Sequence, residues 1–380
     1  VTIAPVDTLR FVGGIRYTHD RKRFDGTSDI FLDICTAPTV PIPACPTAPF
    51  FPFATNVPNL ISTMGLVQVA PGPAPVYIQP SPAAANTIFQ RITIPIDQRL
   101  TTNRTTFRAA VEYDVAPHSL LYASFENGFH AGGFAFAFIA PSFKPETIDA
   151  WTIGSKNRFF GGKLQLNVEA FLWKYKNQQI SHFATDVTGA LVFVTENAGS
   201  STNKGFEIST QLRPVRNTTL HLDLQYLDAK YDEFTYDAPT APSPLITGCP
   251  STALSPTLAR VDCAGFRALR SPEWTINAGA EQVVPLGEYR VTLAADTHYQ
   301  SKSVIGFEML PGISEQKGYF ITNASIEFGP ETGNWSLGAF VNNIEDNRPF
   351  GQSAFNNQFD TFTSSPLPPR TYGVRGRFSF

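Results

Sequence analysis

The sequence predicts an all-β protein, a transmembrane antiparallel β-barrel, on the strength of three observations. Apolar and polar residues alternate with a period of two along about twelve segments. The connections between these segments are alternately short and long. Only 16% of the 380 residues are charged, against roughly 25% in soluble domains. A membrane barrel accounts for all three, since it has short turns at one end, long loops at the other and an apolar face toward lipid.

The predicted strands are defined by alternation and by their proline content. None of the 31 prolines falls inside a segment, as a sheet requires, because proline has no N–H to donate to the ladder. An even number of strands is typical of bacterial barrels. In chain order, the segments lie near 8–21, 104–115, 118–130, 146–159, 163–180, 190–213, 217–231, 273–284, 289–302, 318–328, 334–345 and 370–380.

Four of these segments show an apolar face opposite a polar one most clearly. In a membrane barrel the apolar face points at lipid and the polar face at the lumen. In chain order, Phe206, Ile208 and Leu212 oppose Glu207, Ser209 and Arg213; Leu220, Leu222, Leu224 and Tyr226 oppose His221, Asp223 and Gln225; Tyr289, Val291, Leu293 and Tyr299 oppose Arg290, Thr292, Asp296 and His298; and Tyr372, Val374, Phe378 and Phe380 oppose Thr371, Arg375, Arg377 and Ser379.

The segment 163–180 departs from this pattern. Leu164, Leu166, Val168 and Leu172 share one face, but Phe171, Trp173 and Tyr175 lie on the other. Either a β-bulge changes the register there or aromatic side chains line the lumen.

The connections and the strand ends support a barrel. Short connections near 116–118, 161–162, 214–217, 285–288 and 329–333 alternate with long ones near 22–103, 131–145, 181–189, 232–272, 303–317 and 346–369. We expect the long loops near 22–103, 232–272 and 346–369 to be extracellular. Aromatic residues near segment ends suit interfacial girdles, although aromatics also favour ordinary strands; they include Trp151, Trp274, Tyr319, Trp335 and Tyr372.

Composition excludes several other classes of protein. A net charge of -3 provides no basic field, so no nucleic-acid partner is expected. The longest apolar run, 134–140, is too short for a membrane-spanning helix. The chain begins at Val1 without a basic segment and an apolar run, so we expect a mature form or a fragment.

Several short motifs resemble the C-terminal half of the barrel of TonB-dependent outer-membrane receptors. Their order and spacing together carry the resemblance, which covers nearly the whole chain. The motifs are 14–18 (GIRYT), 121–125 (LYASF) with 128–129 (GF) and 132–134 (GGF), 145–147 (PET), 153–156 (IGSK), 197–199 (NAG), 204–207 (KGFE), 341–344 (VNNI) with Asp346, 369–373 (PRTYG) and the terminal Phe380.

The resemblance implies a 22-stranded barrel filled by an N-terminal plug, of which residues 1–380 form one barrel domain with about the last twelve strands and no plug. It implies uptake of a scarce, bulky nutrient, such as a ferric siderophore or cobalamin, across the outer membrane of a Gram-negative bacterium. TonB would act through the absent plug region. Tyr372, Phe378 and Phe380 would be the signal read by the barrel-assembly machinery, or a strand contacting outer-membrane lipid. The alternatives are a self-contained twelve-stranded diffusion channel or adhesin and, as a third class, a soluble all-β protein.

Four cysteines allow three disulfide connectivities. The pairs Cys35–Cys45 and Cys249–Cys263 are favoured, because each would then stay inside one extracellular loop, where disulfides persist. Unpaired thiols are the alternative. A metal site is not expected, since no CxxC or nearby histidine completes one.

Ligand contacts are predicted from loop aromatics. Phe134, Phe136 and Phe138 could stack on a small-molecule ligand or belong to an upper girdle. Residues 34–90 carry no Asp, Glu, Lys, Arg or His, which favours a neutral or partly apolar ligand if this loop touches one. Otherwise the loop is a cover without ligand contacts.

No catalytic residue, enzymatic activity or cofactor is predicted. The common hydrolase, metalloprotease and phosphate-binding motifs do not occur. His221 and His298 are expected to be hydrogen-bonded spectators on the lumen face. A Ser, His and Asp or Asn arrangement assembled across strands, as in a lipase, stays open as a remote alternative.

Overall fold

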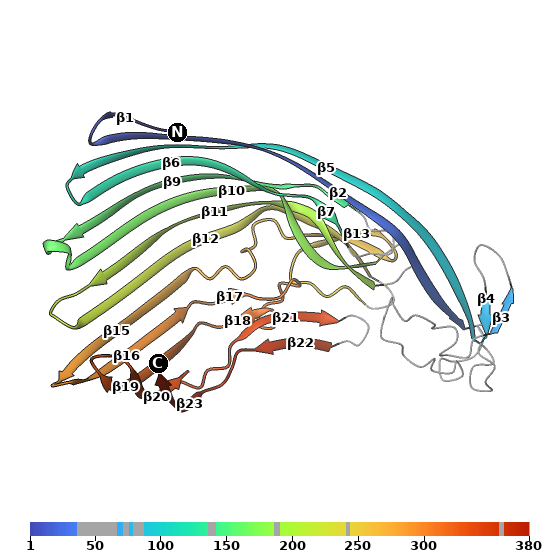
Figure 1. Cartoon of the computed structure of the whole chain (residues 1–380). Helices are drawn as coiled ribbons and strands as arrows, with labels where there is room; N and C mark the ends of the chain where they lie inside the picture. Colours follow the sequence, from blue (N-terminus) through green and yellow to red (C-terminus); the bar gives the residue numbers. More distant parts are fainter. Residues whose placement is uncertain are drawn as a thin grey trace.

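A computed structural model describes residues 1–35, 67–70, 76–78, 87–135, 142–185, 191–240, 244–356 and 361–379. These residues form a 17-stranded antiparallel sheet and three two-stranded hairpins (Figure 1). Among them, no helix is long and apolar enough to cross a membrane. The fold class predicted from the sequence is therefore confirmed.

The sheet is a meander in which each long strand pairs with the next long strand along the chain. All the predicted segments are strands, and the structure adds the short first strand. In order they are β1 (Thr2–Val6), β2 (Leu9–Cys35), β5 (Thr87–Ala116), β6 (Ser119–His130), β9 (Glu146–Phe159), β10 (Leu164–Thr185), β11 (Leu191–Leu212), β12 (Thr218–Pro239), β15 (Trp274–Leu286), β16 (Tyr289–Gln300), β19 (Tyr319–Pro330), β20 (Trp335–Asn342) and β23 (Thr371–Phe378).

Short strands lie in the long connections. The hairpin β3–β4 adds to β5, and β13 and β14 add to the end of β12. The other three hairpins are separate small sheets. The short strands are β3 (Val67–Ala70), β4 (Val76–Ile78), β7 (Gly133–Phe134), β8 (Ser142–Phe143), β13 (Ser251–Ser255), β14 (Leu258–Asp262), β17 (Ser303–Val304), β18 (Glu315–Gln316), β21 (Phe350–Asn356) and β22 (Thr361–Pro366).

The strands β2, β5 and β12 run farther into the long connections than alternation predicts, so the predicted boundaries of the loop 22–103 and the start of the loop 232–272 are wrong, whereas 346–369 lies between β20 and β23. The β2–β5 ladder continues to Cys35 opposite Thr87. Beyond a bilayer neither face of a strand meets lipid, so the sequence there need not alternate. Pro95 is tolerated inside β5 because that stretch pairs with β2 alone, and an edge position needs no N–H. The other two regions contain β13 with β14 and β21 with β22.

One face of the sheet is apolar and solvent-accessible in the isolated chain. Leu222 stands opposite Thr210 on β11 and Ala278 on β15, and it is 42% exposed. Asp223, the next residue, stands opposite Ser209 and Asn277 on the other face. Exposed apolar side chains of this kind extend along the sheet, as a lipid-facing band requires; they include Phe11, Ile15, Phe107, Val111, Ile153, Val168, Leu222, Leu293, Ile326, Leu337 and Val374.

The aromatic residues of 163–180 lie on the polar face, and no bulge explains them. The β9–β10 register is unbroken from Leu164 opposite Phe159 to Lys176 opposite Thr147. Phe171 is buried and stacks on Trp173, with 4.4 Å between ring centroids. Of the two explanations that the sequence leaves open, aromatic side chains on the lumen face is the correct one.

Aromatic side chains on the apolar face gather in two rows. One row lies toward the long connections and includes Phe125 against Trp151 and Tyr226 against Trp274. The other lies near the short turns and joins Tyr289, Phe328 and Trp335. Two rows at opposite ends of an apolar band are the arrangement expected of interfacial girdles.

The face assignment predicts opposite tolerances at adjacent positions. Leu222→Arg should destabilise folding into phospholipid vesicles by about 2–4 kcal/mol if residue 222 lies near the bilayer midplane, whereas Asp223→Arg, on the polar face, should cost far less. Urea titration of vesicle-bound protein, read by gel mobility without heating, measures the difference. Equal costs for the two variants would contradict the assignment.

Candidate functional site

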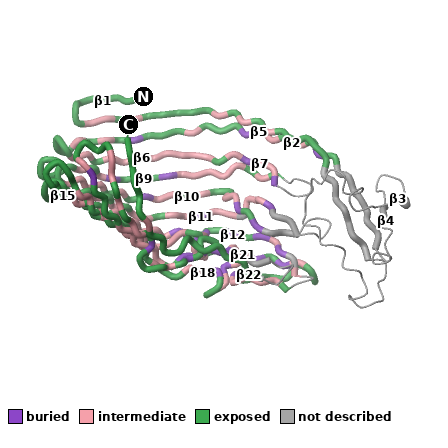
Figure 2. Tube along the Cα trace, turned by 60° about the horizontal axis from the view of Figure 1, so that its bottom comes forward, coloured by how far each residue is buried: buried purple, intermediate pink, exposed green. Residues whose placement is uncertain are grey.

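The described parts of the long connections lie at one end of the sheet, opposite the tight turns (Figure 1). Four stretches meet there: 227–240 of β12 and its extension, 244–272, 303–317 and 350–354, which we call the loop cluster. Buried stretches gather toward this end of the sheet (Figure 2). The single-layer sheet has little core of its own, so most fully buried side chains are here. The buried apolar residues are Ile180, Ala229, Tyr231, Phe234, Tyr236, Ala238, Cys249, Val261, Cys263, Ala268 and Met309.

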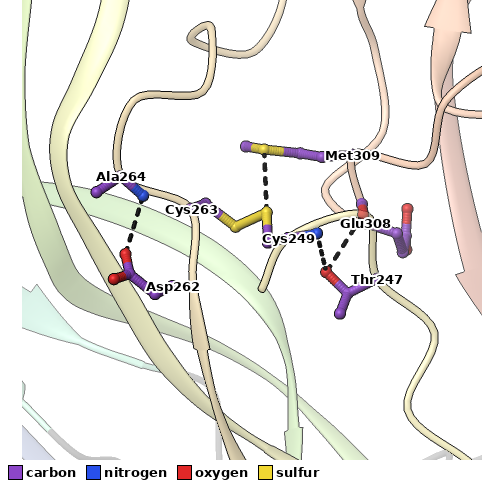
Figure 3. Close-up of a disulfide and its surroundings, with 7 residues drawn as sticks. All are labelled: Thr247, Cys249, Asp262, Cys263, Ala264, Glu308 and Met309. Carbon is purple, nitrogen blue, oxygen red and sulfur yellow. Dashed lines mark hydrogen bonds between the residues drawn. A yellow bond between two sulfur atoms is a disulfide. The ribbon is translucent and has the colours of Figure 1, made fainter. Parts of the chain in front are cut away.

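A disulfide joins Cys249 to Cys263 inside this core (Figure 3). The pairing is the one favoured from the sequence. The Cys249 Sγ lies 3.6 Å from the Sδ of Met309, which belongs to the 303–317 connection. Thr247 Oγ1 accepts a hydrogen bond from the Cys249 N–H at 3.1 Å and donates one to the Glu308 carbonyl at 3.4 Å. The disulfide therefore closes the 244–272 connection on itself, while the Met309 contact and the Thr247 hydrogen bond join this connection to 303–317.

Close backbone contact strengthens this junction. The Gly248 N–H donates to the Glu308 carbonyl at 2.7 Å. A Cβ at position 248 would lie 2.2 Å from the Met309 carbonyl oxygen, so only glycine allows the two backbones to approach this closely.

Backbone hydrogen bonds connect the remaining stretches of the loop cluster. The N–H of Cys263 donates to Phe234, and that of Ala268 donates to Ala229, which fasten 244–272 onto β12. The bonds Arg270 N–H to Val304 O and Ser353 N–H to Ile305 O then bring 303–317 and β21 alongside. The cluster is thus held by directional bonds as well as by apolar contact.

The loop cluster encloses one side of a cavity of about 470 Å³, within the roughly 300–1,000 Å³ typical of ligand pockets. Side chains from four separate stretches and from the end of β10 form its walls. The lining residues are Gln178, Gln179, Ile180, Ser181, His182, Tyr231, Tyr236, Ala238, Leu245, Ile246, Leu269, Arg270, Ile305, Phe307, Glu308, Gln352, Ser353 and Ala354.

Three rings pack together on one wall. His182 stacks on Phe307 with centroids 4.9 Å apart and an interplanar angle of 4°, and Tyr236 lies 4.8 Å from Phe307 and 5.1 Å from His182. The His182 Nε2 is 2.6 Å from Glu196 Oε1. Burial raises the pKa of Tyr236 to about 12, although a hydrogen bond with Thr247 opposes the rise. This phenol is therefore uncharged at neutral pH.

Charged groups around the cavity are paired. The Arg270 Nη2 donates to Gln352 Oε1 at 2.9 Å. Elsewhere in the loop cluster, Arg260 on β14 donates two hydrogen bonds to the carboxylate of Asp237 at the end of β12. These bonds hold the pKa of Asp237 below its usual value.

Of the three residues predicted to bind ligand, Phe134 is described by the structure, and it does not line this cavity. Phe134, on β7, lies 6.0 Å from Phe24 of β2 between ring centroids, at another part of the sheet end. Phe136 and Phe138 lie outside the described residues, as do Cys45 and the side chain of Cys35. Tyr372 and Phe378, of the predicted assembly signal, are 82% and 72% exposed on the apolar face, whereas Phe380 lies outside the described residues.

Sequence reasoning missed the cavity residues. They come from positions as far apart as Gln178 and Ala354, and short motifs do not connect them. The one available signal was Cys249 with Cys263, which marked the connection 232–272 as an ordered part of the protein.

Comparison with known proteins identifies the fold family. The family described as TonB dependent receptor-like, beta-barrel, matches residues 1–344. No curated protein matches the chain. Among solved structures, the ferric yersiniabactin uptake receptor FyuA from Yersinia pestis is similar with a TM-score of 0.63 at 12% identity, and the alignment covers 100% of this chain and 44% of that one.

Two further structures show the same fold. The siderophore receptor PiuA from Acinetobacter baumannii has a TM-score of 0.58 at 14% identity, with 99% of this chain and 54% of that chain covered. The copper transporter OprC has a TM-score of 0.56 at 14% identity, with 100% and 48% covered. The chain therefore spans about half the length of these structures.

The disulfide should hold the loop cluster but not the sheet. In the double variant Cys249→Ala and Cys263→Ala, loss of the crosslink frees a loop that such a bond stabilises by about 3 kcal/mol in the chain-entropy description. Trypsin should then cut faster after Arg260 and Arg267, while the strands stay intact by mass spectrometry. Met309→Leu keeps the disulfide and should leave cleavage unchanged; equal cleavage of the double variant and the parent would contradict this role.

The Asp237–Arg260 pair should make the end of β14 sensitive to acid. Because the pKa of Asp237 is lowered in the folded protein, its stabilising contribution is present above the unfolded pKa and is lost as pH falls through the folded one. Both side chains are largely exposed, so the effect is small. The protection factors of β14 amides against hydrogen exchange should fall below about pH 4, and Asp237→Asn should remove that pH dependence.

Proposed function

Because the chain belongs to the TonB-dependent receptor-like β-barrel family, we propose that it forms wall strands and loops of a receptor that imports a scarce, bulky nutrient. The protein is located in the outer membrane of Gram-negative bacteria, where barrels of this family reside. The nutrient class that best fits is a ferric siderophore, with cobalamin as the other candidate. Transport rather than catalysis is the proposed activity.

Two neighbouring features, the polar face of the sheet and the cavity in the loop cluster, carry this proposal. The polar face provides a lumen wall, and the loop cluster provides a braced cavity of about 470 Å³ next to it. Loops positioned by a rigid scaffold are where binding residues concentrate. The similar structures are described as a ferric yersiniabactin uptake receptor, a siderophore receptor and a copper transporter, which supports metal-linked uptake as the first class to test.

The proposed partners follow from the same family. TonB would supply energy through a plug domain, and the barrel-assembly machinery would recognise the strand carrying Tyr372, Phe378 and Phe380. Lipid would cover the apolar face. A second, independent ligand contact is proposed for the aromatic side chains of Phe134, Phe136 and Phe138, and substitution of these residues would test it.

A self-contained channel is the less favoured alternative. Closing this sheet alone would require pairing between β1 and β23. Among the described strands, β1 pairs only with β2 and β23 only with β20. An unpaired edge in lipid is costly, because its backbone groups find no other partner there.

Uptake assays separate the two functions. Cells that carry the gene should accumulate at least one radiolabelled compound from a panel of ferric siderophores and cobalamin, and deleting either the gene or TonB should reduce this uptake at least tenfold. A diffusion channel would instead admit small sugars and antibiotics equally well with and without TonB. Gene-dependent uptake that ignores TonB would therefore overturn the receptor proposal.

A further inference from the structure

Two polar atoms in the wall of the cavity have no hydrogen-bond partner within the described residues. One is the Oγ of Ser353, a residue only 7% exposed, and the other is the Oε1 of Gln178. Both residues line the cavity. A buried polar atom without a partner is destabilising, and a bound molecule that supplies the partner would offset that cost.

The position of the Ser353 hydroxyl depends on a glycine. A Cβ at Gly306 would lie 2.4 Å from the Ser353 Oγ, so any larger residue at 306 would displace the hydroxyl. The backbone around it is fixed by the hydrogen bond from the Ser353 N–H to the Ile305 carbonyl. The surrounding atoms therefore fix the position of the hydroxyl but form no hydrogen bond with it.

The charges of the lining disfavour an ion as occupant. Arg270 and Glu308 contribute one formal charge of each sign, and the Arg270 guanidinium already donates to Gln352. Glu308 places a carboxylate in the wall, which would repel an anion. The remaining polar lining residues are glutamines, serines, tyrosines and His182, and Gln178 Oε1 can only accept a hydrogen bond.

The rest of the wall suits a flat apolar group. The rings of His182, Tyr236 and Phe307 form one side, and aromatic rings favour offset or edge contacts with other rings. The contact between Met309 and Cys249 braces the chain directly after Phe307 and Glu308. A braced wall loses little conformational freedom on binding, which favours affinity.

We propose that this cavity is a binding site for an uncharged aromatic group bearing a hydrogen-bond donor and acceptor, such as an aryl amide or a phenol. The donor of this group would form a hydrogen bond to Gln178 Oε1, and its acceptor would accept a hydrogen bond from the Ser353 hydroxyl. The ring would lie against the wall formed by Phe307. The inference rests on the proposed function in one respect: the group bound here is taken to be a part of the imported nutrient that does not contact the metal. The site itself is built wholly from residues of this chain.

Benzamide and benzoate form a matched pair of probes, because they share a ring and a shape but differ in charge and in donor. Saturation-transfer NMR on the purified protein in detergent micelles should show saturable benzamide binding, with benzoate at least tenfold weaker. Gln178→Leu and Ser353→Ala should each weaken benzamide binding roughly three- to tenfold, since a neutral hydrogen bond contributes about 0.5–1.5 kcal/mol. Thermal stability of both variants should be unchanged or raised, because neither atom has a partner to lose.

Ser201→Ala is the control, because its Oγ is also buried without a partner but does not line the cavity. It should leave benzamide binding unchanged. Ala354→Phe, which puts a large ring at a lining position, should abolish binding. The proposal is overturned if benzoate binds as well as benzamide, if neither variant weakens binding, or if no saturable binding occurs, as when water alone fills the space. Failure of uptake with intact benzamide binding would instead count against the receptor function alone.

Discussion

Backbone pairing across the sheet is the constraint on which the rest of this structure depends. In hydrocarbon an unpaired N–H or carbonyl has no water to bond, so a spanning chain must satisfy every one of these groups internally. The antiparallel ladders from β2 to β23 meet that requirement strand by strand, with register shifts only in the β5–β6, β10–β11 and β11–β12 ladders among the long strands described. Side chains are thereby released from making a central core. They divide instead into an apolar face and a polar face, and the low charge of the sequence follows from that division.

A sheet of this kind cannot by itself order the connections beyond the membrane, where water competes for every backbone group. The loop cluster solves this problem locally, with a core of its own around Phe234 and Val261 and a crosslink at Cys249–Cys263. Its hydrogen bonds to β12 make the strand and the connection one unit. The walls of the cavity are therefore braced by bonds within the loop cluster itself.

The predictable and unpredictable parts of the fold differ in the physical origin of their sequence signal. Residues such as Leu222 and Asp223 alternate because lipid and lumen lie on opposite sides, so the strands within the membrane could be located from sequence. The extension of β2 to Cys35 and of β5 from Thr87 could not, because water on both faces removes the pattern. β1 was missed because five residues containing Pro5 show too little alternation to detect. Cys249–Cys263 was predictable because the pairing is local, with a separation of 14 residues. The cavity was not, because Gln178, Phe307 and Ser353 meet only through the folded connections.

The two kinds of polar residue in this protein have different energetic roles, and that difference separates structure from function. On the lumen face, the Tyr122 hydroxyl donates to Glu169 and Gln225 donates to Glu207, so each group has a partner and adds to the stability of the wall. In the cavity, the Ser353 hydroxyl and the side-chain oxygen Oε1 of Gln178 are buried without a hydrogen-bond partner. A wall polar group that is paired gains nothing from a ligand, since binding would only exchange one partner for another. An unpaired one gains a full hydrogen bond. Recognition in this protein is therefore expected where the fold leaves polar atoms unsatisfied and holds them in place, rather than where polar residues are most numerous.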